Sequence, residues 1–104
     1  MALELSQMER DGNYIVGAKG EIDLYSSPQL RDAILKACKA KKQKVGIDLR
    51  EVAYMDSSGV ATLVEGLQAA GGAASFALVA PSQPVLKVLQ LSRLDSVFTI
   101  VEEM

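Results

Sequence analysis

Short apolar runs alternate with helical stripes along this chain, and this alternation constrains the fold more than any other feature. Residues 45–49 and 75–80 read as strands buried within a sheet. Each lies between segments in which apolar residues recur every three or four positions, the spacing of one buried helix face. Strands that alternate with single helices favour right-handed crossovers and a mainly parallel sheet. The sequence therefore predicts an α/β fold.

The first helix has a clear start. Ser26 or Ser27 can cap it, and Pro28 suits the first turn because its missing N–H has no partner there. Ser26 with Gln29 also fits a capping box. The apolar stripe of this helix ends at Cys38, which we interpret as a small core residue rather than a reactive thiol.

Two further helices are expected. One begins near Ser57 or Ser58 and stops at the two glycines of residues 71–72, since glycine takes the left-handed C-terminal conformation without strain. The other covers residues 82–91 and can be capped by Ser82. Residues 97–101 predict a last strand or edge segment.

The N-terminal segment predicts an antiparallel hairpin. Residues 3–8 and 14–18 have strand patterns, and the turn signal of residues 10–13 separates them. The predicted order is β-β-α-β-α-β-α-β. We expect a single α/β domain over residues 1–104, with a mixed but mostly parallel sheet and three to four helices.

Charge and residue types exclude several kinds of function. The net charge of -2 argues against a nucleic-acid binder, which needs a clustered basic surface. The one basic run, Lys36, Lys39, Lys41, Lys42 and Lys44, falls at a predicted helix end, where cations suit the helix dipole. The chain has no histidine and no ligand-spaced acidic cluster. We expect no enzyme activity, no catalytic residue, no metal and no cofactor.

Cysteine and hydropathy patterns indicate where the protein resides. A single cysteine forms no internal disulfide, which fits a reducing compartment. No segment resembles a signal peptide, and no apolar run approaches the ~18 residues needed to span a bilayer. We expect a soluble cytoplasmic protein without membrane insertion.

Residues 55–59, Met-Asp-Ser-Ser-Gly, lie where the chain passes from a strand and loop into the second helix. In parallel sheets such junctions lie on the functional edge. A phosphate on a serine here could accept the unpartnered N–H groups of the first turn. Gly59 leaves room for a partner's backbone to approach. A simple cap by Asp56 or Ser57 explains the same residues, so both interpretations stay open.

Nearly the whole chain resembles the STAS domains of bacterial anti-sigma factor antagonists. The resemblance rests on residues 20–23, 45–49, 54–60 and 85–95 in combination. It implies a phosphoacceptor at Ser57, the first hydroxyl residue after the motif aspartate. It also implies a partner anti-sigma factor that is a serine kinase. The unphosphorylated antagonist would bind this kinase and free a sigma factor, phosphorylation would abolish the binding, and a serine phosphatase would restore it.

The same resemblance implies a partner-binding face around the phosphosite. Asp23 matches an aspartate beside the phosphosite, while Tyr25 and Met55 are bulky neighbours that we interpret as partner anchors. The predicted face comprises Asp23, Tyr25, Met55, Asp56, Ser57, Ser58 and Gly59.

A second use of the face stays open. Residues 57–67 also resemble STAS subunits attached to ABC transporters of phospholipid trafficking, which hold a nucleotide-binding ATPase subunit through this surface. A stressosome-type scaffold is a third use of the same domain. The shared motif indicates an interface without selecting the partner.

Overall fold

The N-terminal hairpin forms one edge of a five-stranded sheet in the computed structural model, which describes residues 3–40 and 43–104. Strands β1 (Leu3–Arg10) and β2 (Asn13–Ile22) pair antiparallel. Asp11 and Gly12 connect them with φ angles of 55° and 83°. Positive φ at both positions is typical of the tight turn that matches the twist of a hairpin. The predicted hairpin is confirmed.

The other strands continue the sheet in sequence order, all parallel to β2. They are β3 (Val45–Met55), β4 (Phe76–Val79) and β5 (Thr99–Val101). The predicted mixed, mostly parallel sheet is therefore confirmed. The sequence predicts a strand only over residues 45–49, but β3 continues to Met55. Its register against β2 shifts between Gly17 and Lys19 and again between Gly20 and Glu21, so two irregularities let the longer strand stay paired.

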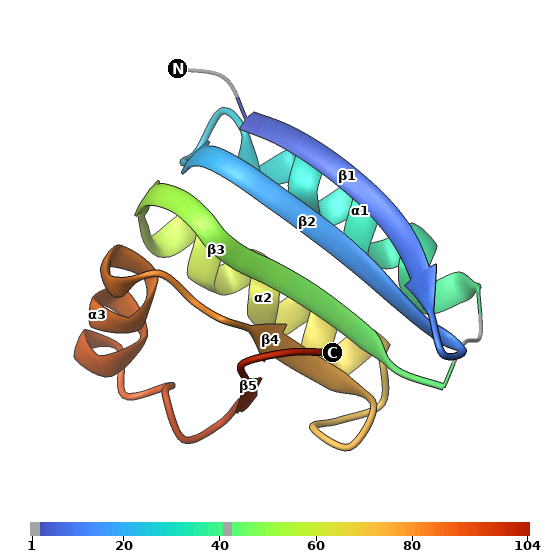
Figure 1. Cartoon of the computed structure of the whole chain (residues 1–104). Coiled ribbons are helices and arrows are strands. Elements are labelled where there is room, and N and C mark those ends of the chain that lie inside the picture. Colours follow the sequence, from blue (N-terminus) through green and yellow to red (C-terminus); the bar gives the residue numbers. More distant parts are fainter. Residues whose placement is uncertain (1–2, 41–42) are drawn as a thin grey trace.

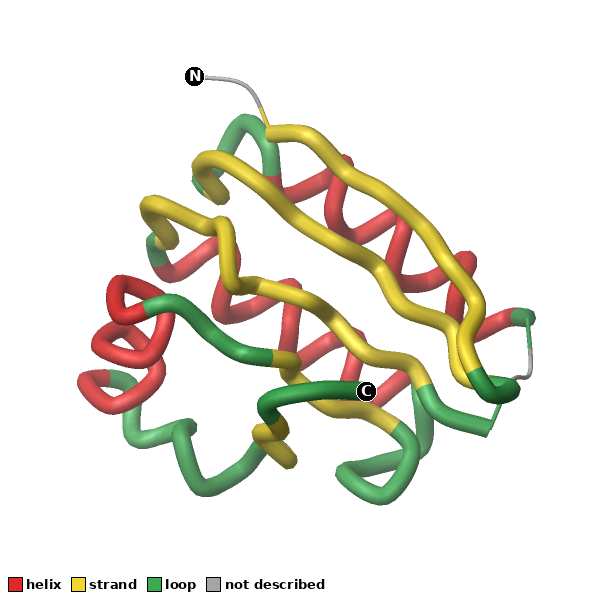
Figure 2. Tube along the Cα trace, in the orientation of Figure 1, coloured by secondary structure: helices red, strands yellow, loops and turns green. Residues whose placement is uncertain are grey.

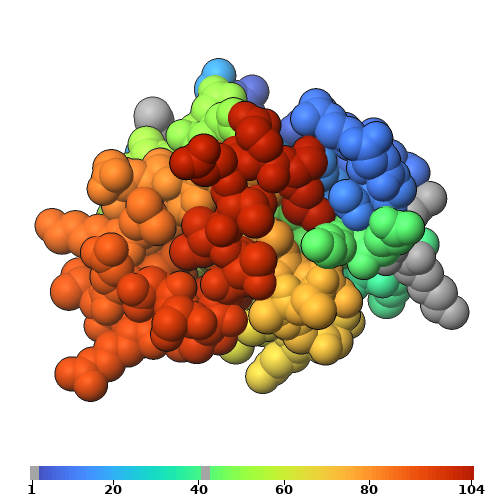
Figure 3. Space-filling view, turned by 60° about the horizontal axis from the view of Figure 1, so that its bottom comes forward, coloured from blue at the N-terminus to red at the C-terminus, as the bar shows by residue number. Residues whose placement is uncertain are grey.

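In the described part of the chain, three helices accompany the sheet: α1 (Ser27–Lys39), α2 (Ser57–Ala69) and α3 (Gln83–Leu91). Figures 1 and 2 show α1 and α2 side by side behind one face of the sheet, while α3 lies at the left, near the C-terminal end of β3. The opposite face carries the C-terminal residues. Figure 3 shows these residues in red, between the hairpin in blue and the orange segment that includes α3.

The core lies between the sheet and its helices, and α3 contributes Val85 and Leu89 to it. Its largest fully buried side chains are Phe76, Ile22, Leu30, Ile34, Ile47, Leu49, Leu63, Leu78, Leu89, Val16, Val52 and Val85. Burial of each such aliphatic side chain contributes about 1.5–3 kcal/mol. Gly66 of α2 permits close packing, because a Cβ there would lie 2.7 Å from Ile34 Cγ2 and 2.9 Å from Phe76 Cζ. Cys38 is partly buried and packs against this core, in agreement with its interpretation as a small packing residue, and burial raises the pKa of its thiol.

Two predicted helix caps are wrong. Gln29 does not complete a capping box with Ser26, because the Ser26 N–H donates to Asp23 Oδ1 at 2.9 Å and the Gln29 amide donates to the Leu3 carbonyl at 3.3 Å. Ser82 precedes α3 without capping it, and its hydroxyl donates to the Val52 carbonyl at 2.6 Å. In both cases the side chain donates to a strand carbonyl, which ties the helix to the sheet.

The predicted cluster of basic residues at a helix end is confirmed for two of its lysines. Lys36 and Lys39 occupy the last turn of α1, where their charge complements the helix dipole. Lys41 and Lys42 lie outside the described residues. Across residues 3–40 and 43–104, no helix has both the length and the apolar character required to traverse a membrane.

Candidate functional site

Two strand-to-helix connections lie together at one edge of the sheet. Strands β2 and β3 end at the same level, with Ile22 paired to Met55. The Asp56 N–H then donates to the Ile22 carbonyl at 3.1 Å. The connection that follows β2, residues 23–26, therefore lies next to the one that begins at Asp56 (Figure 1).

Asp56 caps helix α2. Its Oδ1 accepts from the Ser58 N–H at 2.9 Å and from the Ser58 hydroxyl at 2.7 Å. Its main-chain carbonyl accepts from the N–H groups of Gly59 and Val60, at 3.1 and 3.3 Å. Of the two caps that the sequence left open, the structure has Asp56, and Ser57 is the first residue of the helix.

The two serines of the motif differ in their surroundings. The Ser58 side chain is half-buried, and its hydroxyl is held by Asp56. The Ser57 side chain is exposed, and its hydroxyl makes no hydrogen bond within residues 3–40 and 43–104. A modifying group can therefore reach the Ser57 hydroxyl without breaking a hydrogen bond, whereas the Ser58 hydroxyl would first have to leave Asp56.

The start of helix α2 offers a phosphate fewer free N–H groups than the sequence suggests. We expected a phosphate to accept the unpartnered N–H groups of the first turn. The N–H groups of Ser58, Gly59 and Val60 are already bonded to Asp56. A phosphate on Ser57 would keep the favourable field of the helix dipole, worth about 0.3–1 kcal/mol at an exposed site, without these three hydrogen bonds.

Asp23 organises the neighbouring connection. Its Oδ1 accepts from the N–H groups of Tyr25 and Ser26, each at 2.9 Å, and lies 3.1 Å from the Ser26 hydroxyl. The Ser26 Oγ accepts the Asp23 N–H and also donates to the Glu21 carbonyl, both at 2.9 Å. Hydrogen bonding, first from the Ser26 N–H, lowers the pKa of the Asp23 carboxyl below its usual 3.8. Asp23 is therefore charged at neutral pH and shapes the loop.

This loop presents apolar side chains to solvent. Tyr25 is 90% exposed, as its predicted role as an anchor requires, and Leu24 beside it is 67% exposed. Tyr54, which pairs with Glu21 across β2 and β3, is 50% exposed. Our sequence reasoning missed Leu24 and Tyr54. The signal available was their position directly beside Asp23 and Met55, at the ends of two adjacent strands.

Met55 and Gly59 do not lie on the exposed face, contrary to their predicted contact with a partner. Met55 is 2% exposed, and Gly59 is buried. A Cβ on Gly59 would lie 2.6 Å from Met55 Cγ and 2.8 Å from Ile22 Cγ2. Gly59 thus allows α2 to approach the strand ends closely, and does not make room for a partner's backbone. Met55 and Gly59 are therefore buried packing residues that position the start of α2 against the strand ends.

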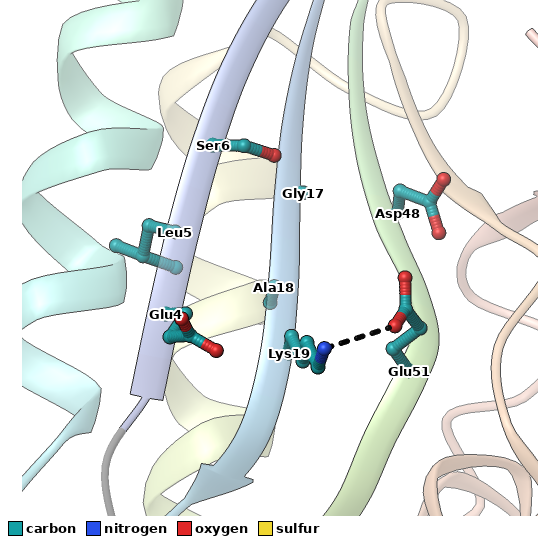
Figure 4. A pocket seen from close by; sticks show the side chains of 8 residues that line it. All are labelled: Glu4, Leu5, Ser6, Gly17, Ala18, Lys19, Asp48 and Glu51. Atoms are coloured by element: carbon teal, nitrogen blue, oxygen red, sulfur yellow. Dashed lines mark ion pairs between the residues drawn. The ribbon is translucent and has the colours of Figure 1, made fainter.

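A cavity of about 330 Å³ lies elsewhere, on the sheet face opposite α1 and α2. Figure 4 shows its lining on β1, β2 and β3, including the ion pair in which Lys19 Nζ lies 3.8 Å from Glu51 Oε2. None of the junction residues line this cavity. Among the described residues, no group of three or more His, Cys, Asp or Glu side chains is arranged to hold a metal. The junction itself presents the exposed Ser57 hydroxyl at the surface.

Comparison with known proteins gives concordant matches. A family model described as "Mlab, STAS domain" matches residues 6–102. The anti-sigma-B factor antagonist of Staphylococcus epidermidis is 32% identical over 69 residues, which cover 66% of this chain. The match spans 64% of the length of that curated relative.

Solved structures extend the similarity over almost the whole chain. An anti-sigma factor antagonist from Mycobacterium paratuberculosis superposes with a TM-score of 0.90 and 25% identity, covering 99% of this chain and 88% of that one. The anti-sigma factor antagonist SpoIIAA, also 25% identical, superposes in its unphosphorylated and phosphorylated forms with TM-scores of 0.73 and 0.68. These cover 95% of this chain and 87% and 90% of SpoIIAA. With its mixed sheet, its paired junctions and the family match over residues 6–102, this chain belongs to the STAS domain family.

Proposed function

We propose that this protein is an anti-sigma factor antagonist controlled by phosphorylation at Ser57. In this proposal the unphosphorylated form binds an anti-sigma factor serine kinase in the cytoplasm and so frees a sigma factor. Phosphorylation switches the binding off, and a serine phosphatase restores it. The protein itself is a regulatory binding domain and not an enzyme. The names of the curated relative and of the solved neighbours support the antagonist role.

The observation that carries the proposal is the contrast between the two serines. The Ser57 hydroxyl is exposed at the first position of α2, whereas the Ser58 hydroxyl is bonded to Asp56 at 2.7 Å. A kinase needs access to the acceptor oxygen, and only Ser57 of this pair offers it without breaking a hydrogen bond to Asp56. The existence of SpoIIAA in a phosphorylated form is consistent with a modification in this family.

Charge explains how a phosphate would act. It adds about -1.5 to -2 charge at neutral pH. The modified side chain would stand beside Asp56 and next to the connection held by Asp23. Because Asp56 already caps α2, the modification leaves the helix start intact and changes only the surface. A partner surface complementary to the unmodified junction would then face a concentrated negative charge, which repels it.

The proposed partner-binding face combines that charge with the apolar loop. Asp23, Asp56, Ser57 and Ser58 supply its polar part, and Tyr25 with Leu24 supplies an exposed apolar part. Large apolar side chains at the centre of an interface carry much of the binding free energy. Tyr25 is therefore the residue of this face whose truncation should weaken binding most.

Phosphate mapping tests the switch. The protein is incubated with its cognate kinase and ATP, and the modified residue is located by mass spectrometry. We expect Ser57→Ala to lose the phosphate and Ser58→Ala, the matched control, to keep it. Transfer to the Ser57→Ala variant at the wild-type level would overturn the site assignment.

A second candidate function is an accessory subunit that binds the ATPase of a phospholipid-trafficking ABC transporter. The specific observation in its favour is that the matching family model carries the name Mlab. Affinity capture from the native cell, with wild type and Ser57→Asp compared, separates the two proposals. Loss of a kinase-fold partner from the variant favours the antagonist. An ATPase captured equally by both proteins favours the transporter subunit.

A further inference from the structure

Strand β1 ends the sheet with a long, regular and unpaired edge. Its eight residues pair with β2 in one continuous register without a bulge. Within the described part of the chain, nothing pairs with its other side, because the strand order places β1 at the end of the sheet. The opposite edge, β5, has only three residues. Long regular edges are templates for pairing with another strand, whereas short edges are protected.

The hairpin turn determines which main-chain groups of β1 face outward. A two-residue turn is closed by a hydrogen-bonded pair, here Arg10 and Asn13. Hydrogen-bonded and non-hydrogen-bonded pairs then alternate along an antiparallel ladder. The even-numbered residues of β1 thus direct their N–H and C=O groups toward β2. Leu5 and Gln7 direct theirs away from the sheet.

An antiparallel copy of β1 fits this edge in one favourable register. With a two-fold axis at Gln7, the outward groups of Gln7 face those of Gln7 in the second copy. The same register places Glu4 opposite Arg10 of the second copy, and Arg10 opposite its Glu4. These side chains are exposed on the same sheet face in each copy. Opposite charges therefore meet twice, as favourable cross-strand pairs require.

An exposed apolar side chain lies at the centre of the same register. Met8 is 48% exposed, on the sheet face that carries Glu4 and Arg10. About the Gln7 axis it stands opposite Ser6 of the second copy and diagonal to the second Met8, within reach of a long side chain. A two-fold axis at Leu5 would pair fewer residues of the two strands and would leave Arg10 without Glu4 opposite it. The register centred on Gln7 is therefore favoured over it by both strand length and charge pairing.

We propose that a second copy of this chain binds along β1 and joins the two sheets into one. This inference goes beyond the proposed function and does not depend on it. Strand β2 separates β1 from the Ser57 junction, so each copy keeps its junction open. The dimer would present two such junctions to partners.

Charge reversal and mixing test the register. Sedimentation velocity on the full chain up to about 1 mM should show a reversible dimer. Glu4→Arg and Arg10→Glu alone should each weaken association by about tenfold, because two cross-strand pairs become repulsive. An equimolar mixture of the two variants should recover it, since every contact then joins opposite charges. A wild type that stays monomeric, or variants that associate as the wild type does, would overturn the proposal.

A backbone variant gives a second test. Gln7→Pro removes the outward N–H of residue 7 and leaves the main-chain hydrogen bonds between β1 and β2 in place. Proline is tolerated at such a position because the strand lies at the edge of the sheet. We expect a monomer, while the control Gln7→Ala, which loses the same bond from the Tyr14 hydroxyl, should still associate. A folded Gln7→Pro protein that dimerises like the wild type contradicts the model. If Gln7→Pro does not fold, the charge-mixing experiment decides.

Discussion

The two strand-to-helix connections at the site both begin with an aspartate, and they use it differently. The Asp23 carboxylate accepts hydrogen bonds within its own loop, from the N–H groups of Tyr25 and Ser26. Helix α1 starts without a side-chain cap. Asp56 directs its carboxylate to the helix and caps α2 through the Ser58 N–H. The first connection is a shaped loop that displays apolar side chains. The second is a capped helix start that displays one open hydroxyl.

Under the proposed function, this difference would separate two tasks of a regulated interface. A rigid loop offers a constant surface, to which Leu24 and Tyr25 contribute exposed apolar area. A capped helix start can carry a modification on Ser57 without losing its own hydrogen bonds, since the cap belongs to Asp56. One junction would thus supply affinity and the other control. Each of the following changes tests one side of this division.

The largest effect should come from filling the space beneath the second junction. Gly59→Val places a branched side chain where even a Cβ would lie 2.6 Å from Met55 Cγ, so we expect a loss of about 2–3 kcal/mol of unfolding free energy. Chemical denaturation measures it. The control is Ala61→Val at an exposed position of the same helix, which should cost less than about 1 kcal/mol. A Gly59→Val variant that loses no more stability than Ala61→Val would contradict the packing role of Gly59.

Removal of the α2 cap should have the next largest effect. Asp56→Ala leaves the Ser58 N–H without its acceptor and should lower the unfolding free energy by about 1 kcal/mol. Asp56→Asn, which retains a capping oxygen, should remain close to the wild type. Thermal unfolding of the three proteins measures the difference. An alanine variant as stable as the asparagine variant would mean that the cap contributes nothing to this helix.

The first junction should respond mainly through Ser26. Ser26→Ala removes the hydroxyl that bridges the Glu21 carbonyl and the Asp23 N–H, so we expect a loss of about 0.5–1.5 kcal/mol. Hydrogen exchange should also rise at the Asp23 amide while the α2 amides stay protected. Ser57→Ala, at an exposed hydroxyl of the other junction, is the matched control and should change neither quantity. Faster exchange throughout both junctions would contradict their independence.

The smallest effect should be the acid response of Asp23. Because its pKa is lowered in the folded protein, the carboxylate's contribution to stability is complete above the usual value of 3.8 and disappears as pH falls through the lowered value. In an NMR titration, the Tyr25 and Ser26 amides should shift with a midpoint below 3.8. Asp23→Asn should abolish this titration. A midpoint at or above 3.8 would mean that these hydrogen bonds do not favour the charged form.

Most of the architecture was predictable because it rests on periodicity. The hairpin, the three helices and the mixed sheet follow from apolar spacing and turn residues, which act locally. The end of β3 was not predictable in this way. Residues 50–55 lack a clean apolar alternation, and their pairing with β2 depends on a register shift between distant segments. The predicted caps at Ser26 and Ser82 failed for a related reason, since both hydroxyls donate to strand carbonyls and neither accepts a helix N–H.

The sequence by itself determined which segment forms the site, because the motif at residues 56–59 and the strand before it place a helix start at a sheet edge. Only the tertiary structure distinguished the roles within that segment. Met55 and Gly59 turn inward because α2 approaches the ends of β2 and β3 closely. Ser57 and Ser58 are identical and adjacent in sequence, yet the direction of the Asp56 carboxylate holds one hydroxyl and leaves the other open.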